Sequence, residues 1–153
     1  MRNSSWNDLV NMIDGKKLSY QPTGFIIDSP WIPGWYGITT IDYYTSDELW
    51  LKSNLKAVNT FPGTWFLPGF WSEYGMCTEP SAFGAKMVFF EKGFPHADKV
   101  LKSLEDTDAL PQPNVKTDGM LPFMISRLRN NEKAIEDAAA KSGESVDINL
   151  ENG

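Results

Sequence analysis

The chain has 153 residues, of which 41% are hydrophobic and 22% charged, and its formal net charge at pH 7 is −6. This composition excludes a disordered chain and suits one folded domain with a core. The acidic balance disfavours a nucleic-acid partner, which needs a basic surface, and no apolar run approaches the roughly 20 residues that span a membrane.

Helices and strands alternate in the first half of the chain. In chain order we expect a helix from Ser5 that Gly15 ends, a short buried strand over 24–28, an aromatic loop over 29–44, a helix over 46–58 and a strand over 64–70. Ser5 with Asp8, and Thr45 with Glu48, predict the capping boxes of the two helices. The loop is expected because two prolines and two glycines interrupt SPWIPGWYGITTIDYY.

Residues 69–84, GFWSEYGMCTEPSAFG, form an irregular stretch that predicts neither a helix nor a strand. Glycines and Pro80 break it, yet it holds Cys77 and the carboxylates Glu73 and Glu79 among aromatic residues. Such a stretch is either a well-packed surface loop or the lining of a pocket.

The second half of the chain predicts one long helix among shorter elements. We expect a locally paired strand over 85–91, a short helix over 98–105, a turn-rich segment over 106–119, a long helix over 122–142 and a strand over 146–150. Met120, Phe123 and Met124 have helical spacing and are expected in the core, whereas residues 127–133, RLRNNEK, predict a solvated helix face. Helices between strands predict parallel βαβ units, so the fold class is α/β.

Cys77 and His96 are the only cysteine and the only histidine. One cysteine cannot form an internal disulfide, and residues 1–15 lack the apolar core of a signal peptide, so we expect a cytoplasmic protein. The residues around His96 do not resemble a positioned catalytic base, and the two side chains lack metal-ligand spacing. We therefore expect a buried Cys77, a surface His96 and no metal site.

Two short motifs, WIPGWY over 31–36 and WSEYG over 71–75, carry a family resemblance. With their context, over nearly all of the chain, they resemble the N-terminal part of the uroporphyrinogen decarboxylase superfamily. That superfamily includes the decarboxylase and cobalamin-dependent methyltransferases, and the decarboxylase reads R-Q-A-G-R-Y and F-S-D-I-L at the matching places. The resemblance implies a (β/α)8 barrel with its site at the carboxyl ends of the strands.

A (β/α)8 barrel takes about 250 residues, so we expect this chain to be an incomplete TIM barrel. Residues 1–153 would form a single partial domain, the N-terminal portion of the barrel with an added helix and aromatic loop, and no internal boundary. The predicted strand over 146–150 is followed by no helix that would cover it, and this pattern is typical of a fragment.

The resemblance also implies the site residues. The candidate catalytic residue is Glu73, and the candidate substrate-binding residues are Trp31, Trp35, Tyr36, Trp71 and Glu79. Glu73 matches the essential aspartate of the decarboxylase and keeps its charge. The aromatic residues either shape a pocket for a flat ligand or pack the N-terminal segment against the barrel, and Glu79 either contributes to the site or braces the turn at Pro80.

One difference from the family restricts the class of substrate that we expect. The decarboxylase holds the acidic side chains of its tetrapyrrole with two arginines, and the matching residues here are Trp31 and Trp35. An indole cannot replace the paired charged hydrogen bonds of an arginine, so uroporphyrinogen is disfavoured. The methyltransferase or an uncharacterised branch is the closer comparison.

The expected ligand is therefore a corrinoid or tetrapyrrole-like small molecule, with a corrinoid protein and a second copy of the chain as candidate protein partners. Corrinoid and zinc are candidate cofactors of the full-length parent only, so the fragment alone is expected to bind no cofactor and to be inactive. Two alternatives stay open: a true uroporphyrinogen decarboxylase, and a non-catalytic interaction or subunit module with an exposed aromatic surface.

Overall fold

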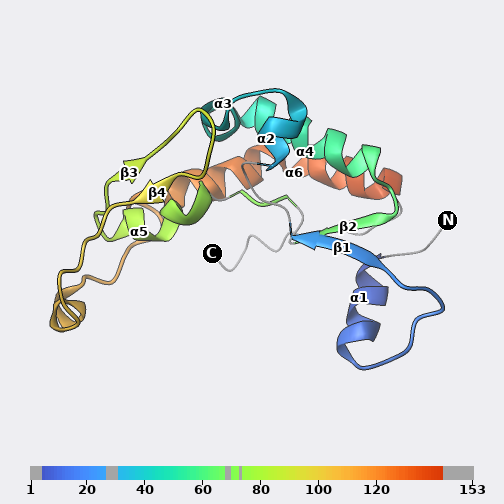
Figure 1. Cartoon of the computed structure of the whole chain (residues 1–153), viewed down its shortest axis with the longest axis horizontal. Coiled ribbons are helices and arrows are strands. Elements are labelled where there is room, and N and C mark those ends of the chain that lie inside the picture. Colours follow the sequence, from blue (N-terminus) through green and yellow to red (C-terminus); the bar gives the residue numbers. More distant parts are fainter. Residues whose placement is uncertain (1–4, 27–30, 68–69, 73, 143–153) are drawn as a thin grey trace.

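The structure is a computed structural model that describes residues 5–26, 31–67, 70–72 and 74–142 (Figure 1). In chain order its elements are α1 (Ser5–Ile13), β1 (Thr23–Ile26), α2 (Trp31–Tyr36), α3 (Thr40–Thr45), α4 (Asp47–Thr60), β2 (Thr64–Leu67), the 3-10 helix η1 (Gly75–Cys77), α5 (Thr78–Ala82), β3 (Met87–Val88), β4 (His96–Ala97), the 3-10 helix η2 (Glu105–Ala109) and α6 (Leu121–Ser142). The described part is mostly helical with two small sheets, which confirms the α/β class, and it contains no barrel. The predicted strand over 146–150 lies outside the described residues.

β1 and β2 pair in parallel, with Thr23 opposite Thr64 and Ile26 opposite Leu67. The chain between them passes through α2, α3 and α4, because parallel strands need a long crossover connection (Figure 1). This pair confirms the predicted parallel βαβ unit. The second sheet, β3 with β4, is antiparallel and local, as expected for the strand over 85–91.

The predicted loop over 29–44 was wrong, because two short helices occupy most of it. Pro33 lies in the first turn of α2, where a missing N–H breaks no intrahelical hydrogen bond. A capping box then starts α3: the Asp42 amide donates to Thr39 Oγ1 at 3.0 Å, and the Thr39 amide donates to Asp42 Oδ2 at 3.2 Å. The helix expected over 46–58 is α4, although Ser46 rather than Thr45 caps it.

Two further expectations need correction. The stretch over 69–84 contains η1 and α5 and is not wholly irregular. The helix expected over 98–105 does not form, and the 3-10 helix η2 begins only at Glu105, the last residue of that range. Asp106 Oδ2 accepts hydrogen bonds from the amides of Lys102 and Ser103 at 2.8 and 2.9 Å, which is a local turn that competes with helix formation.

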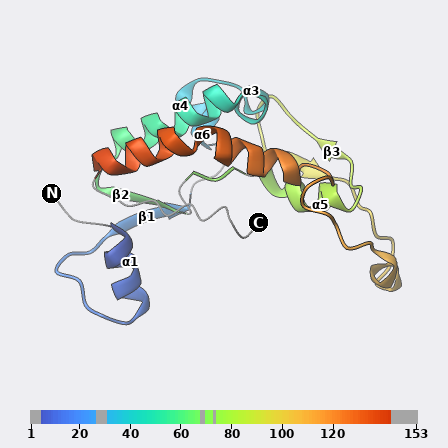
Figure 2. The ribbon, with the colours of Figure 1, turned by 180° about the vertical axis from the view of Figure 1, so that it is seen from behind.

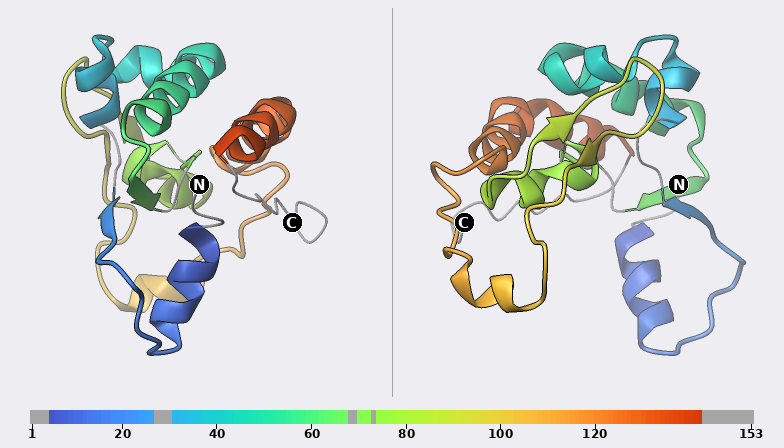
Figure 3. Two further views of the ribbon diagram at one scale, coloured as in Figure 1. Left: turned by 90° about the vertical axis from the view of Figure 1, so that its right-hand side faces the viewer. Right: turned by 60° about the vertical axis from the view of Figure 1, so that its left-hand side comes forward.

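The core lies where α3, α4 and the segment around Tyr74 meet the long helix α6, and α4 and α6 lie side by side (Figures 2 and 3). Its buried hydrophobic residues are Ile32, Tyr43, Tyr44, Trp50, Tyr74 and Ile135. Met120 and Met124 pack against this core as predicted, but Phe123 is 56% exposed. No helix in the described ranges is long and apolar enough to cross a membrane.

β1 contradicts the buried strand predicted over 24–28, since all four of its residues are exposed. Phe25 is 56% and Ile26 79% exposed, so apolar side chains of β1 contact solvent rather than the core. Two-stranded sheets are marginal by themselves, and the helical layer therefore supplies most of the stability of the described residues.

Gly119 provides a test of how tightly α6 is joined to α5. It has φ +55, and a Cβ there would lie 2.5 Å from the Ala82 nitrogen, while the Met120 amide donates to Ser81 Oγ at 2.8 Å. We expect Gly119→Ala to lower the free energy of unfolding by about 2–4 kcal/mol, through backbone strain and a close contact. Urea unfolding of the purified chain measures the change.

Gly34→Ala is the matched control, because Gly34 lies within α2 and a Cβ there meets nothing within 4 Å. It should leave stability unchanged or raise it by up to about 1 kcal/mol. An unfolding midpoint for Gly119→Ala equal to that of the parent chain would contradict the tight junction.

Candidate functional site

The two family-like motifs leave the sheet at the same edge. β1 ends at Ile26 and is followed by α2, and β2 ends at Leu67 and is followed by Trp71. Because Ile26 and Leu67 are register partners in a parallel pair, both motifs come after level carboxyl ends. Sites in parallel α/β folds form at this edge.

Three of the predicted substrate-binding residues come together on α2. Trp31 and Trp35 stack with ring centroids 5.5 Å apart and planes 10° apart, and Phe61 lies 6.3 and 5.7 Å from them. Lys56 Nζ lies 5.3 Å from the Trp35 ring centroid and 5.0 Å from that of Tyr36. We call these five residues the aromatic cluster. Trp31 is 42% and Phe61 36% exposed, so part of the cluster faces solvent.

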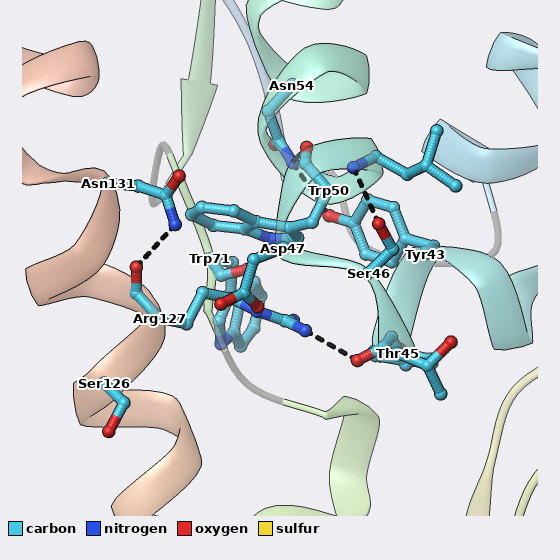
Figure 4. Close-up of polar contacts among 12 residues, drawn as sticks. Tyr43, Thr45, Ser46, Asp47, Trp50, Asn54, Trp71, Ser126, Arg127 and Asn131 are labelled. Carbon is cyan, nitrogen blue, oxygen red and sulfur yellow. Dashed lines mark hydrogen bonds and ion pairs between the residues drawn. The ribbon is translucent and has the colours of Figure 1, made fainter.

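Trp71 belongs to a different set of contacts. Its backbone carbonyl accepts a hydrogen bond from the indole nitrogen of the fully buried Trp50 at 3.0 Å (Figure 4). Within the described residues, no ring contact joins Trp71 to the aromatic cluster. Trp71 and the aromatic cluster therefore form two separate sets of contacts among the described residues.

A buried arginine, which the sequence analysis missed, organises the second set. Arg127 is 1% exposed; its Nε donates to Asp47 Oδ1 at 2.7 Å and its Nη2 to the Tyr44 carbonyl at 2.6 Å. The guanidinium carbon lies 4.3 Å from the Tyr74 ring centroid and 5.4 Å from that of Trp50. Figure 4 shows Arg127 beside Trp50 and Asp47. The solvated face predicted over 127–133 is therefore wrong at Arg127.

Helical spacing could have indicated this burial. Arg127 lies on the same stripe of α6 as Met124 and Ile135, three residues after the first and eight before the second. A charged residue usually lies in solvent, but a long charged side chain that finds partners can be buried. Arg127 Nη1 is buried and has no hydrogen-bond partner in the described part of the chain.

The remaining predicted site residues lie apart from both sets. Glu73 falls outside the described residues, although its neighbours Ser72 and Tyr74 are buried. Glu79 is exposed in the first turn of α5, and no hydrogen bond or ion pair joins it to the described residues. No partner among the residues that the structure describes would therefore hold Glu79 in a site.

The predictions for the cysteine and the histidine are confirmed in their burial. Cys77 is fully buried, and His96 is exposed, at the start of β4, with Nε2 3.9 Å from Asp98 Oδ1. Among the described residues, no group of three or more His, Cys, Asp or Glu side chains could hold a metal ion. The part of the chain described therefore does not fit a zinc site.

Comparison with known proteins identifies no relative: no protein-family model, curated protein or solved structure matches the chain. The family membership and the residue roles that it implies therefore stay predictions. The geometry above is the basis for choosing among them.

The Arg127–Asp47 pair should stabilise the helical layer. Asp47→Asn leaves the buried guanidinium without its carboxylate, and we expect a loss of about 2 kcal/mol in the free energy of unfolding. This is less than for a fully buried pair, because the Asp47 side chain is 43% exposed. Urea unfolding of Asp47→Asn, Arg127→Met and the double variant measures the coupling, and the double variant should lose less than the two single losses added.

Glu48→Gln is the control for that cycle, since the neighbouring Glu48 is exposed and pairs with Lys52 on the helix surface. It should leave the unfolding midpoint unchanged. Strict additivity of the two single losses would show that Asp47 and Arg127 do not act as a pair.

Tyr74 makes stability sensitive to alkaline pH. Burial raises the pKa of the Tyr74 phenol, with the Arg127 charge lowering it and Asp47 raising it by smaller amounts. The folded state therefore binds this proton more tightly than the unfolded chain does. The resulting contribution to the free energy of unfolding is complete below about pH 10 and is lost as pH rises through the folded-state pKa. Between pH 8 and pH 11 the free energy of unfolding should fall less for Tyr74→Phe than for the parent chain. Equal decreases in the two proteins would contradict this assignment.

Proposed function

We propose that the chain is the N-terminal part of an enzyme of the uroporphyrinogen decarboxylase superfamily, most like its corrinoid-dependent methyltransferase or uncharacterised branch. The shared sheet edge carries this proposal. Both motifs that resemble the family, residues 31–36 and 71–75, follow level carboxyl ends of parallel β1 and β2, which is where a (β/α)8 barrel binds its substrate.

The aromatic cluster supports a flat, largely uncharged ligand. Stacked Trp31 and Trp35 offer an apolar ring surface, and they stand where the decarboxylase has arginines for an acidic tetrapyrrole. Indole rings stack on the face of a macrocycle, but they cannot form the paired hydrogen bonds with which an arginine binds a carboxylate. A corrin ring with mostly amide side chains suits this surface better than uroporphyrinogen does.

Glu73 is the proposed acid, base or hydrogen-bonding carboxylate of this site, and Arg127 is a positioning residue for it. Arg127 packs on Tyr74 at 4.3 Å and on Trp50 at 5.4 Å, and Trp50 in turn holds the Trp71 carbonyl. The chain is thus fixed on both sides of position 73 by contacts that converge on one guanidinium. Fixed flanks restrict where a carboxylate at that position can act.

Zinc takes no part in the chemistry proposed for this chain. The methyltransferases use zinc to activate a thiol, but no group of three or more metal-binding side chains occurs among the described residues. The role proposed for the described residues is to bind and orient a ligand without a metal.

One observation favours a second candidate, a non-catalytic interaction or subunit module. The apolar side chains of β1 are exposed, Ile26 to 79%, and such residues mark surfaces that another chain covers. A module of this kind would form a stable homodimer or bind a partner protein without needing the aromatic cluster. Sedimentation of the isolated chain at several concentrations tests for self-association.

A titration with cobinamide, a corrinoid with an uncharged amide periphery, tests the first candidate. The chain should bind it saturably but weakly, with Kd on the order of 0.1–1 mM, because only part of the pocket is present. Trp31→Ala and Trp35→Ala should each weaken binding about fivefold or more, as the loss of one stacking ring predicts. Isothermal titration calorimetry avoids interference from ligand absorbance.

Phe123→Ala is the matched control, since Phe123 is also an exposed aromatic residue but lies on α6. It should bind cobinamide as the parent chain does. An affinity for coproporphyrin about a hundredfold above that for cobinamide at low salt would favour the decarboxylase instead. Absence of saturable binding to either probe, or methyl transfer by the isolated 153 residues, would overturn the proposal.

A further inference from the structure

We propose that Lys56 binds a carboxylate of the ligand, so that the aromatic cluster takes a flat ring with at least one peripheral carboxylate. This inference rests on the proposed function and refines its substrate class. It assigns a role to a residue of α4, outside both family-like motifs, that only the folded arrangement brings to Tyr36 and Trp35.

The position of Lys56 sets it apart from its neighbour on the same helix. Lys52, one turn earlier, forms an ion pair with Glu48, whereas no described carboxylate lies within ion-pair distance of Lys56. The Lys56 ammonium instead lies 5.3 Å from the Trp35 ring centroid and 5.0 Å from that of Tyr36. The one formal charge of the aromatic cluster is therefore positive, in a chain of net charge −6.

Contact with the rings leaves the ammonium free to bind an anion. A cation–π interaction at an exposed site contributes only about 0.5–1 kcal/mol and uses the ring face rather than an acceptor atom. The ammonium has three donors and no acceptor, and Lys56 is exposed. The rings of Trp35 and Tyr36 thus hold a point charge within the aromatic cluster, whose Trp31 side chain is 42% exposed.

A single lysine selects for acidic ligands less strongly than two arginines do. An ammonium is a single point charge without the planar fork that matches a carboxylate, so it gives a modest preference for an acidic side chain. Trp31 and Trp35 together offer stacking and no further charge. The chemistry that fits is a corrin-like ring with few carboxylates and an otherwise uncharged periphery.

Two corrinoid probes separate charge from stacking. Cobyrinic acid carries carboxylates on the same ring that carries amides in cobinamide. By calorimetry at low salt, the parent chain should bind cobyrinic acid about fivefold more tightly than cobinamide, and this preference should vanish in high salt because the pair is exposed. Lys56→Gln should abolish the preference, and Lys56→Arg should keep it.

Lys52→Gln is the matched control, because Lys52 lies on the same helix and is already paired with Glu48. It should retain the fivefold preference. Equal binding of the two probes by the parent chain, or an unchanged preference in Lys56→Gln, would overturn the role of Lys56 and leave the proposed function standing. Absence of binding to both probes would overturn the proposed function, and this inference with it.

Discussion

The buried guanidinium of Arg127 is the interaction on which the rest of the described structure depends. It joins α6 to the junction of α3 and α4: Tyr44 contributes a carbonyl from the last turn of α3, and Asp47 a carboxylate from the first turn of α4. A cation near a helix carboxyl end and an anion near an amino end both suit the helix dipoles. The same guanidinium packs on Trp50 and Tyr74, so one charge ties three helices to the segment that follows β2.

Most of the fold could be predicted where hydrophobic periodicity was strong. The helices over α1, α4 and α6, the strand β2 and the parallel crossover all followed from spacing and from the order of elements. α2 and α3 could not be predicted by weighing prolines and glycines as breakers alone. Pro33 is harmless in a first turn, and the capping signal of Thr39 and Asp42 was overlooked.

The candidate site was predictable only in part, because its contacts are long-range. Trp31, Trp35 and Tyr36 are close in sequence, so their clustering needed no more than a short helix. Lys56 and Arg127 reach their partners from other helices, and no local pattern encodes such contacts. For Arg127 the apolar stripe of α6 was a usable signal, but burial of a charge depends on partners that only the folded chain supplies.

The exposed face of β1 bears on both candidate functions. A two-stranded parallel sheet with Phe25 and Ile26 in solvent is not a stable arrangement by itself, and either further barrel strands or a partner chain would cover it. The two explanations differ in what they require of the carboxyl ends. A docking surface needs apolar area but places no demand on residues 31–36 and 71–75, whereas a barrel enzyme needs both motifs to follow level strand ends, as they do in the register of β1 and β2. The proposed enzyme would account for the edge and the exposed face together, whereas a docking surface would account for the exposed face alone, and for this reason we place the enzyme first among the two proposals.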